Sequence, residues 1–431
     1  MRNSSAPKSG IMSEAGVEDD FRKERGAVQK LLYSEAVSAF GGGLWFSMWA
    51  VYLTAVKGIP AASMGLAMGL GGGAGLLAAV PVGALADRHG ARQVFVTVSL
   101  ARGLLVLLFL TTNGFWSLLV AAALFTAAET SGRGVKVTLV YLLMPDHRRL
   151  TVLAQARVVQ HITYAAGAGA AAWVLSTDTA GPYYAALTTV ALSAFLSAAV
   201  LIGLPPTPPV PAAQRSSGTR AVRDIPFLTL MSTTALLSLC WPLLSSGLPL
   251  WLQYRTAAPV WLAPVTVVIS SLFIALYQVR VTRQGESLRG AVRSTRKAGI
   301  ALAACCLLLA AAAWPSDALL SSLTVLAGLA AHIYGELHYV ASRWGLSLRL
   351  MRRDAEGEYQ GLAASTEGAV ATVGPAMITT LVTGALVGGW AVLAVVFVAA
   401  AAPTPALCRR ALRARGAGGS TGPAPREESG R

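Results

Sequence analysis

Residues 83–92 form a short polar stretch that reads Gly83-Ala84-Leu85-Ala86-Asp87-Arg88-His89-Gly90-Ala91-Arg92. Long apolar stretches lie on either side of it, at 61–86 and at 93–112. A helix needs about 20 apolar residues to cross the hydrocarbon layer of a bilayer, and both stretches reach that length. The polar stretch is therefore predicted to be the turn between two membrane-spanning helices.

Apolar stretches of the same kind recur along the whole chain. They lie near 31–54, 61–86, 93–112, 115–135, 153–176 and 181–204, and then near 225–252, 259–280, 298–314, 318–345, 360–386 and 388–407. The spacing from Asp146 to Gly167 is similar to the spacing from Asp354 to Gly374. This similarity indicates a weak internal repeat between the two sets of six stretches. The sequence therefore predicts an all-α membrane protein of about 12 transmembrane helices in two pseudo-symmetric six-helix bundles.

These stretches divide the chain into five parts. The predicted parts are a cytoplasmic tail at 1–30, a six-helix bundle at 31–204, a cytoplasmic linker at 205–223, a second six-helix bundle at 224–408 and a disordered cytoplasmic tail at 409–431. The linker is rich in proline and arginine, which favours a break between the bundles. The first tail mixes acidic and basic residues and lacks a signal-peptide pattern, so we expect it to stay in the cytoplasm.

The charges of the chain report its orientation in a membrane. Only 13% of the 431 residues are charged, whereas a soluble domain has about 25%. The predicted cytoplasmic connections and tail carry Arg88, Arg92, Lys136, Arg148, Arg149, Arg280, Arg283, Arg289, Arg293, Arg296, Lys297, Arg352, Arg353, Arg409, Arg410, Arg413 and Arg415. The opposite connections contain only Lys57 and Arg255. This asymmetry predicts both termini on the cytoplasmic side of the cell membrane, and it explains the net charge of +15 without a nucleic-acid partner.

The sequence contains no pattern typical of an enzyme or of a metal protein. The four cysteines lie in or beside apolar stretches and lack the spacing of a zinc site or a disulfide framework. The Gly-Lys-Ser/Thr of a phosphate-binding loop is absent, so no ATPase module or subunit is implied. We see no nucleophile and base at catalytic spacing. The prediction is a protein without catalytic activity, bound metal or cofactor.

The carboxylate of Asp87 needs a partner, because it lies where a helix ends and opposes the dipole of that helix. Arg88, Arg92 or the N-terminus of another helix could provide one. Gly83 and Gly90 permit a close helix approach and a tight reversal of the chain. The turn is then either a latch between helices or a solvated reverse turn.

The turn resembles the signature of the major facilitator superfamily of secondary transporters. The residues that carry this resemblance are Gly83, Leu85, Asp87, Arg88, Gly90 and Arg92. The linker, the loop at 148–149 and the segments 357–361 and 374–375 extend it over the whole chain. The resemblance implies the fold of that family, and a turn that holds the cytoplasmic side shut in one conformation and releases it in the other. The fifth span lacks the Gly-Pro pair of drug–proton antiporters, which leaves the energy source and the cargo open.

Ionisable side chains inside the predicted spans are the candidate proton or substrate sites, because each costs roughly 2.5–3.5 kcal/mol near the bilayer centre. They are Glu129, Arg133, His161, His332, Glu336 and Glu367. Glu129 and Arg133 are four residues apart, so they either neutralise each other or serve transport. His332 and Glu336 repeat this spacing, with His338 nearby. A histidine in a span can also be a packing residue.

Two tryptophans on pseudo-equivalent spans are candidate contacts for a substrate. Trp45 lies on the first span and Trp241 on the seventh. Trp251 and Tyr254 lie near the end of the seventh span, where aromatic residues usually belong to the membrane interface. An amphipathic small molecule would suit walls formed by Trp45 and Trp241.

The leading hypothesis is a secondary active transporter that works by alternating access and exports a small amphipathic drug or metabolite, using the proton gradient. Carboxylates of the fourth, tenth or eleventh span would exchange protons, and the turn at Asp87 would gate. One alternative is uptake or uniport of a small metabolite. Another is a membrane sensor that keeps the fold without transporting.

Overall fold

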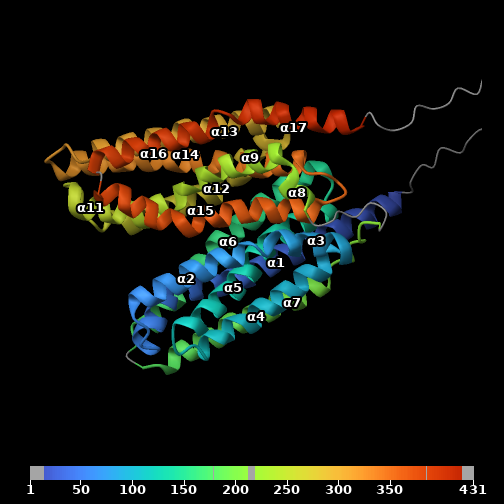
Figure 1. Ribbon diagram of the computed structural model, residues 1–431, viewed down its shortest axis with the longest axis horizontal. Coiled ribbons are helices and arrows are strands. Elements are labelled where there is room, and N and C mark those ends of the chain that lie inside the picture. Colours follow the sequence, from blue (N-terminus) through green and yellow to red (C-terminus); the bar gives the residue numbers. More distant parts are fainter. Residues whose placement is uncertain (1–13, 178, 212–218, 385, 420–431) are drawn as a thin grey trace, which may run out of the picture.

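The computed structural model describes residues 14–177, 179–211, 219–384 and 386–419. These residues form helices and no strand. Figure 1 shows two helical bundles, one built from the first half of the sequence and the other from the second. The all-α architecture of two bundles is therefore confirmed.

The N-terminal half runs from α1 to α7. Its helices are α1 (Glu14–Val51), α2 (Ala61–Leu76), α3 (Ala79–His89), α4 (Ala91–Leu107), α5 (Phe115–Leu143), α6 (Asp146–Leu175) and α7 (Gly181–Ile202). A π-helical turn at Tyr52–Val56 continues α1. Helices α2 and α3 follow one path across the bundle, and a break at 77–78 separates them.

The C-terminal half runs from α8 to α17. Its helices are α8 (Arg220–Arg223), α9 (Ile225–Ala235), α10 (Cys240–Pro242), α11 (Leu248–Arg255), α12 (Leu262–Thr282), α13 (Leu288–Ala311), α14 (Ala318–Leu350), α15 (Glu356–Gly384), α16 (Leu386–Ala401) and α17 (Thr404–Gly419). Short 3-10 and π segments join α9, α10 and α11 into one irregular path around Pro242. The backbone nitrogen of a proline carries no hydrogen and therefore cannot donate a helical hydrogen bond.

Ten helical paths in the described chain are long and apolar enough to cross a membrane. Helices α6 and α15 are not among these ten, and each carries polar residues within its span, such as Arg157 and Glu367. They contain 30 and 29 residues. At about 1.5 Å per residue, either can cross a hydrocarbon layer of about 30 Å. With them, the predicted spans are all accounted for.

Helices extend into both predicted tails, which corrects two boundaries. Residues 14–30, predicted as part of a tail, form the start of α1, where Ala27 and Val28 are buried and Glu24 pairs with Arg148 at 2.8 Å. Residues 409–419, predicted to be disordered, continue α17, which packs on α9 and in which Ala411 is buried. Residues 1–13 and 420–431 lie outside the described chain.

Each half has its own apolar core. Trp45, Phe109 and Phe125 form an aromatic cluster in the N-terminal half, with ring centroids 4.6–6.0 Å apart. In the C-terminal half, Trp251 stacks edge-on against Trp390 and donates to the carbonyl of Leu309 at 2.6 Å. Trp251 is 1% exposed, so it packs inside the bundle instead of facing outward as a residue of an interfacial belt would. Its indole N–H has a backbone acceptor inside the bundle, as a buried tryptophan usually does.

The two halves meet at one end and spread apart at the other (Figure 1). They converge where α3 and α8 lie, which is also the end where α1 begins and α17 ends. We call this end the terminal face. Helix α15 packs against α3 and α5 across the junction, and α12 packs against α6. This junction positions the groups described next.

Candidate functional site

Asp87, in the last turn of α3, binds the first turn of α15 in the other half. Its Oδ1 accepts a hydrogen bond from the backbone N–H of Gly357 at 2.7 Å, and its Oδ2 accepts one from Glu358 at 3.1 Å. The first N–H groups of a helix have no partner inside the helix, and the dipole makes that end positive. Asp87 therefore finds its partner in another helix's N-terminus rather than in Arg88 or Arg92.

Glycines allow the backbones of α3 and α15 to touch beside this bond. A Cβ on Gly83 would lie 2.0 Å from the carbonyl oxygen of Gly357, and a Cβ on Gly357 would lie 2.2 Å from that of Gly83. One turn further, a Cβ on Gly361 would lie 2.2 Å from the oxygen of Ala79. Any larger residue at these positions would push the two halves apart. We call Asp87, Gly83 and the Gly357–Gly361 segment the latch.

The other residues of the predicted turn fix the reversal of the chain and the position of the linker. Gly90 has a φ of +92°, which L side chains rarely adopt. Arg92 donates to the carbonyl of Leu204 at 2.7 Å, and its backbone N–H donates to Thr207 at 3.0 Å. Leu85 and Arg88 are exposed. The turn therefore contributes Asp87 and Gly83 to the junction and uses Gly90 and Arg92 to fix their position.

A second carboxyl group lies beside the latch. Glu356, the first residue of α15, is 6% exposed. Burial and the neighbouring Asp87 raise its pKa to about 7, although Tyr141 and Arg149 act in the opposite direction. The proton affinity of this group therefore depends on how closely Asp87 approaches α15.

A second contact between the halves lies deep in the bundles. Arg157 of α6 forms an ion pair with Glu336 of α14, and their side chains are 11% and 4% exposed. The indole N–H of Trp241 donates to the same carboxylate at 3.0 Å. His332 completes the surroundings, with Nδ1 3.9 Å from Glu336 and Nε2 2.8 Å from the carbonyl oxygen of Cys240. The carboxylate of Glu336 thus links Arg157 of the N-terminal half to Trp241 and His332 of the C-terminal half.

A cavity of about 240 Å³ lies between the halves, next to this ion pair. We call it the interhalf cavity. Its polar lining consists of Arg133, Lys136, Arg157, Gln160, Arg343, Ser347, Gln360 and Glu367, and its aromatic lining of Trp241 and Trp344. Arg343 is held inside the C-terminal half, because its two terminal nitrogens donate to the carbonyls of Met231 and Ala363 and to the hydroxyls of Thr234 and Thr366.

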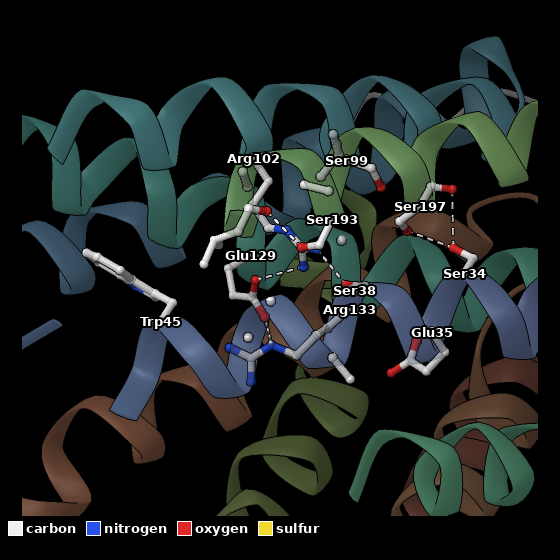
Figure 2. A pocket seen from close by; sticks show the side chains of 18 of the residues that line it. Ser34, Glu35, Ser38, Trp45, Ser99, Arg102, Glu129, Arg133, Ser193 and Ser197 are labelled. Carbon is white, nitrogen blue, oxygen red and sulfur yellow. Dashed lines mark hydrogen bonds and ion pairs between the residues drawn. The ribbon is translucent and has the colours of Figure 1, made fainter. Parts of the chain in front are cut away.

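A smaller cavity, of about 90 Å³, lies inside the N-terminal half (Figure 2). Glu129 points into it and pairs with Arg102 at 3.2 Å and with Arg133 at 4.0 Å. Arg102 also donates to Ser38, and Lys136 donates to both oxygens of Glu35 at 3.0 and 3.1 Å. The predicted pair of Glu129 and Arg133 exists, but Arg102 is the closer partner. Arg133 lines both cavities.

The structure brings some of the predicted residues together and separates others. Arg133, Glu367 and Trp241 line the interhalf cavity, with Glu336 and His332 directly behind Trp241. Trp45 is 1% exposed and belongs to the core at the edge of the smaller cavity. His161 is half-buried near Arg157. His338 packs edge-on against Tyr334, at 4.4 Å between ring centroids, rather than joining Glu336.

Arg343 was missed in the sequence, although an arginine within an apolar span is itself a signal. The position of Arg343 in the sequence does not indicate that its guanidinium binds backbone carbonyls of α9 and α15. The described residues contain no group of three or more His, Cys, Asp or Glu that could hold a metal ion.

Comparisons with known proteins agree on the fold. Residues 31–375 match a family model described as Major Facilitator Superfamily. A human organic anion transporter superposes with a TM-score of 0.66 at 15% identity, covering 88% of this chain and 98% of its own. By sequence, no curated protein matches the chain.

Two further solved structures superpose equally well. A bacterial homologue of the iron transporter ferroportin, in an outward-facing state, has a TM-score of 0.66 at 15% identity and covers 90% of this chain and 99% of its own. A proton:xylose symporter has a TM-score of 0.66 at 11% identity and covers 89% and 95%. At these identities the likeness is one of fold.

Proposed function

The chain belongs to the major facilitator superfamily, and from this membership we propose that it is a proton-coupled secondary transporter that exports a small amphipathic drug or metabolite. It works by alternating access, in which the two halves rock about a central substrate site. The substrate occupies the interhalf cavity, between Arg133 and Trp241. The latch and the Arg157–Glu336 pair keep the terminal face closed, and both must part before it opens.

In this proposal the terminal face is the cytoplasmic one, and the protein lies in the cell membrane. Arg148, Arg149, Arg352 and Arg353 support this, because they all lie near that face and basic residues prefer the cytoplasmic side. The described conformation is then closed toward the cytoplasm. Opening toward the cytoplasm requires α15 to leave α3.

Glu336 carries the proposal for proton coupling. It is a buried carboxylate whose ion partner, Arg157, belongs to the other half. A proton on Glu336 would remove the negative charge that holds Arg157, and leaving a buried partner unpaired costs about 3–5 kcal/mol. Proton binding would therefore weaken the contact between the halves. A carboxylate paired only within its own half would not have this effect.

Transport by purified protein in proteoliposomes tests this function. We expect an imposed pH gradient to drive movement of a compound to which expression of the protein gives tolerance. A protonophore that collapses the gradient should stop this movement. Counterflow that proceeds at the same rate with and without the gradient would contradict proton coupling and would indicate uniport.

A further inference from the structure

We propose that the substrate is an amphipathic organic monoanion, whose carboxylate binds Arg133 and whose apolar body lies against Trp241 and Trp344. This inference rests on the proposed transport function, since it names the class of compound that the interhalf cavity holds. It is carried by the balance of charges inside the bundles.

Basic side chains outnumber acidic ones around the two cavities. Among the described residues, Arg102, Arg133, Lys136, Arg157 and Arg343 face Glu35, Glu129, Glu336 and Glu367. One positive charge is therefore left over. A charge without a counter-ion is unfavourable within the hydrocarbon layer. A monovalent anion in the cavity would bring the group to neutrality.

We assign the excess charge to Arg133, because Arg343, which is also 4.0 Å from its carboxylate, is 5% exposed and donates to four other acceptors. Glu129 is held by Arg102 at 3.2 Å, whereas Arg133 reaches the same carboxylate only at 4.0 Å. Lys136 binds both oxygens of Glu35, and Arg157 is paired with Glu336. The Arg133 side chain is also 42% exposed, the largest fraction among these basic residues. Its guanidinium can therefore present its planar set of donors to a carboxylate.

The walls of the interhalf cavity suit the rest of such a molecule. Trp241 and Trp344 lie on the C-terminal side, and Val137, Leu153 and Ala156 on the N-terminal side. Aromatic and aliphatic walls favour an apolar or aromatic body, and a few polar groups fix its orientation. Because the charge comes from one half and the tryptophans from the other, the substrate would contact both halves at once.

Binding to purified protein in nanodiscs tests the substrate class without any gradient. The probes are benzoate, naphthoate and phenylacetate, each compared with its own primary amide, and acetate as the carboxylate without an apolar body. Tryptophan fluorescence and thermal stability report binding. We expect the aromatic carboxylates to bind at least about tenfold more tightly than their amides and than acetate, as a charge-assisted contact and an aromatic wall require.

Variants locate the binding group. Arg133→Gln should lower the affinity for the carboxylates at least about tenfold, while Arg133→Lys should keep most of it. Arg255→Gln is the matched control, because Arg255 is an exposed arginine outside both cavities. The comparison of carboxylates with amides in the unmodified protein stands even if Arg133→Gln does not fold.

Several outcomes would overturn the inference. These are equal binding of amides and carboxylates, binding of none of the carboxylates, or unchanged affinity in a folded Arg133→Gln variant. The outcome is separate from that of the transport assay. A preference for carboxylates without any response to a pH gradient would support this inference and contradict proton coupling. Gradient-driven transport of neutral compounds alone would support proton coupling and contradict this inference.

Discussion

Asp87 and Glu336 both connect the two halves, but they use different partners. The carboxylate of Asp87 accepts hydrogen bonds from backbone N–H groups of α15, at a place where glycines bring two helices into contact. Glu336 binds side chains, namely Arg157 from the other half and Trp241 from its own. The bonds of Asp87 lie beside the glycine contact at the terminal face, whereas Glu336 lies deep in the bundles, where a proton would weaken its pair with Arg157. We therefore assign closure of the terminal face to Asp87 and response to protons to Glu336.

The largest effect is expected from filling the helix contact in the latch. Gly83→Leu would place a Cβ 2.0 Å from the oxygen of Gly357, so α3 and α15 could no longer close. Overpacking of this kind should lower the closed population about 100-fold and abolish transport. Gly69→Leu on α2 is the control, since no atom lies within 4 Å of a Cβ there. Equal transport by both variants would break the assignment of closure to this contact.

The next effect concerns the charge of Asp87. Asp87→Asn keeps the shape but loses the negative charge that binds the N-terminus of α15. Hydrogen bonds to charged groups contribute about 1.5–3 kcal/mol, so the closed population should fall about tenfold or more. Transport in proteoliposomes measures the consequence. Asp146→Asn removes an exposed carboxylate that pairs only with Arg149 on its own helix, and its transport should stay near that of the unmodified protein.

Glu336→Gln should abolish the response to protons, because the neutral amide mimics the protonated carboxylate. The amide can still accept from Trp241, but it cannot gain or lose a proton. We expect gradient-driven transport to fall about tenfold while counterflow is retained. Glu35→Gln is the matched control, because Glu35 pairs with Lys136 inside one half and should leave coupling intact. If the two variants lose coupling equally, the distinction between pairs within and between halves fails.

The smallest effect is expected from Glu356, which lies beside Asp87. In the closed state its pKa rises from 4.5 to about 7. Release of α15 removes the part of this shift that Asp87 causes, so the closed state binds the proton more tightly than the open state. Closure should then weaken by a few-fold as the pH rises through about 7. Glu356→Gln should remove that part of the pH dependence, as measured by the accessibility of a cysteine at the terminal face. An unchanged pH profile would exclude Glu356.

The spans and the turn were predictable because they depend on local sequence. Apolar length fixed the helices, and the position of Asp87 at a helix end required a partner. The choice of α15 as this partner was not predictable, since Gly357 is 270 positions away in the sequence. The same holds for Arg157, whose partner Glu336 is known only once α6 and α14 are placed side by side. The tails were misjudged at 14–30 and 409–419, because polar composition hid faces that pack on other helices.

The distance between the halves at the terminal face tests the central claim most directly. Spin labels at His147→Cys and Arg349→Cys, both exposed near that face, report it in nanodiscs, and the four native cysteines are buried. We predict a single short distance when the latch is intact, and a second, longer distance in Asp87→Asn. A single distance that stays the same in Asp87→Asn would contradict the account.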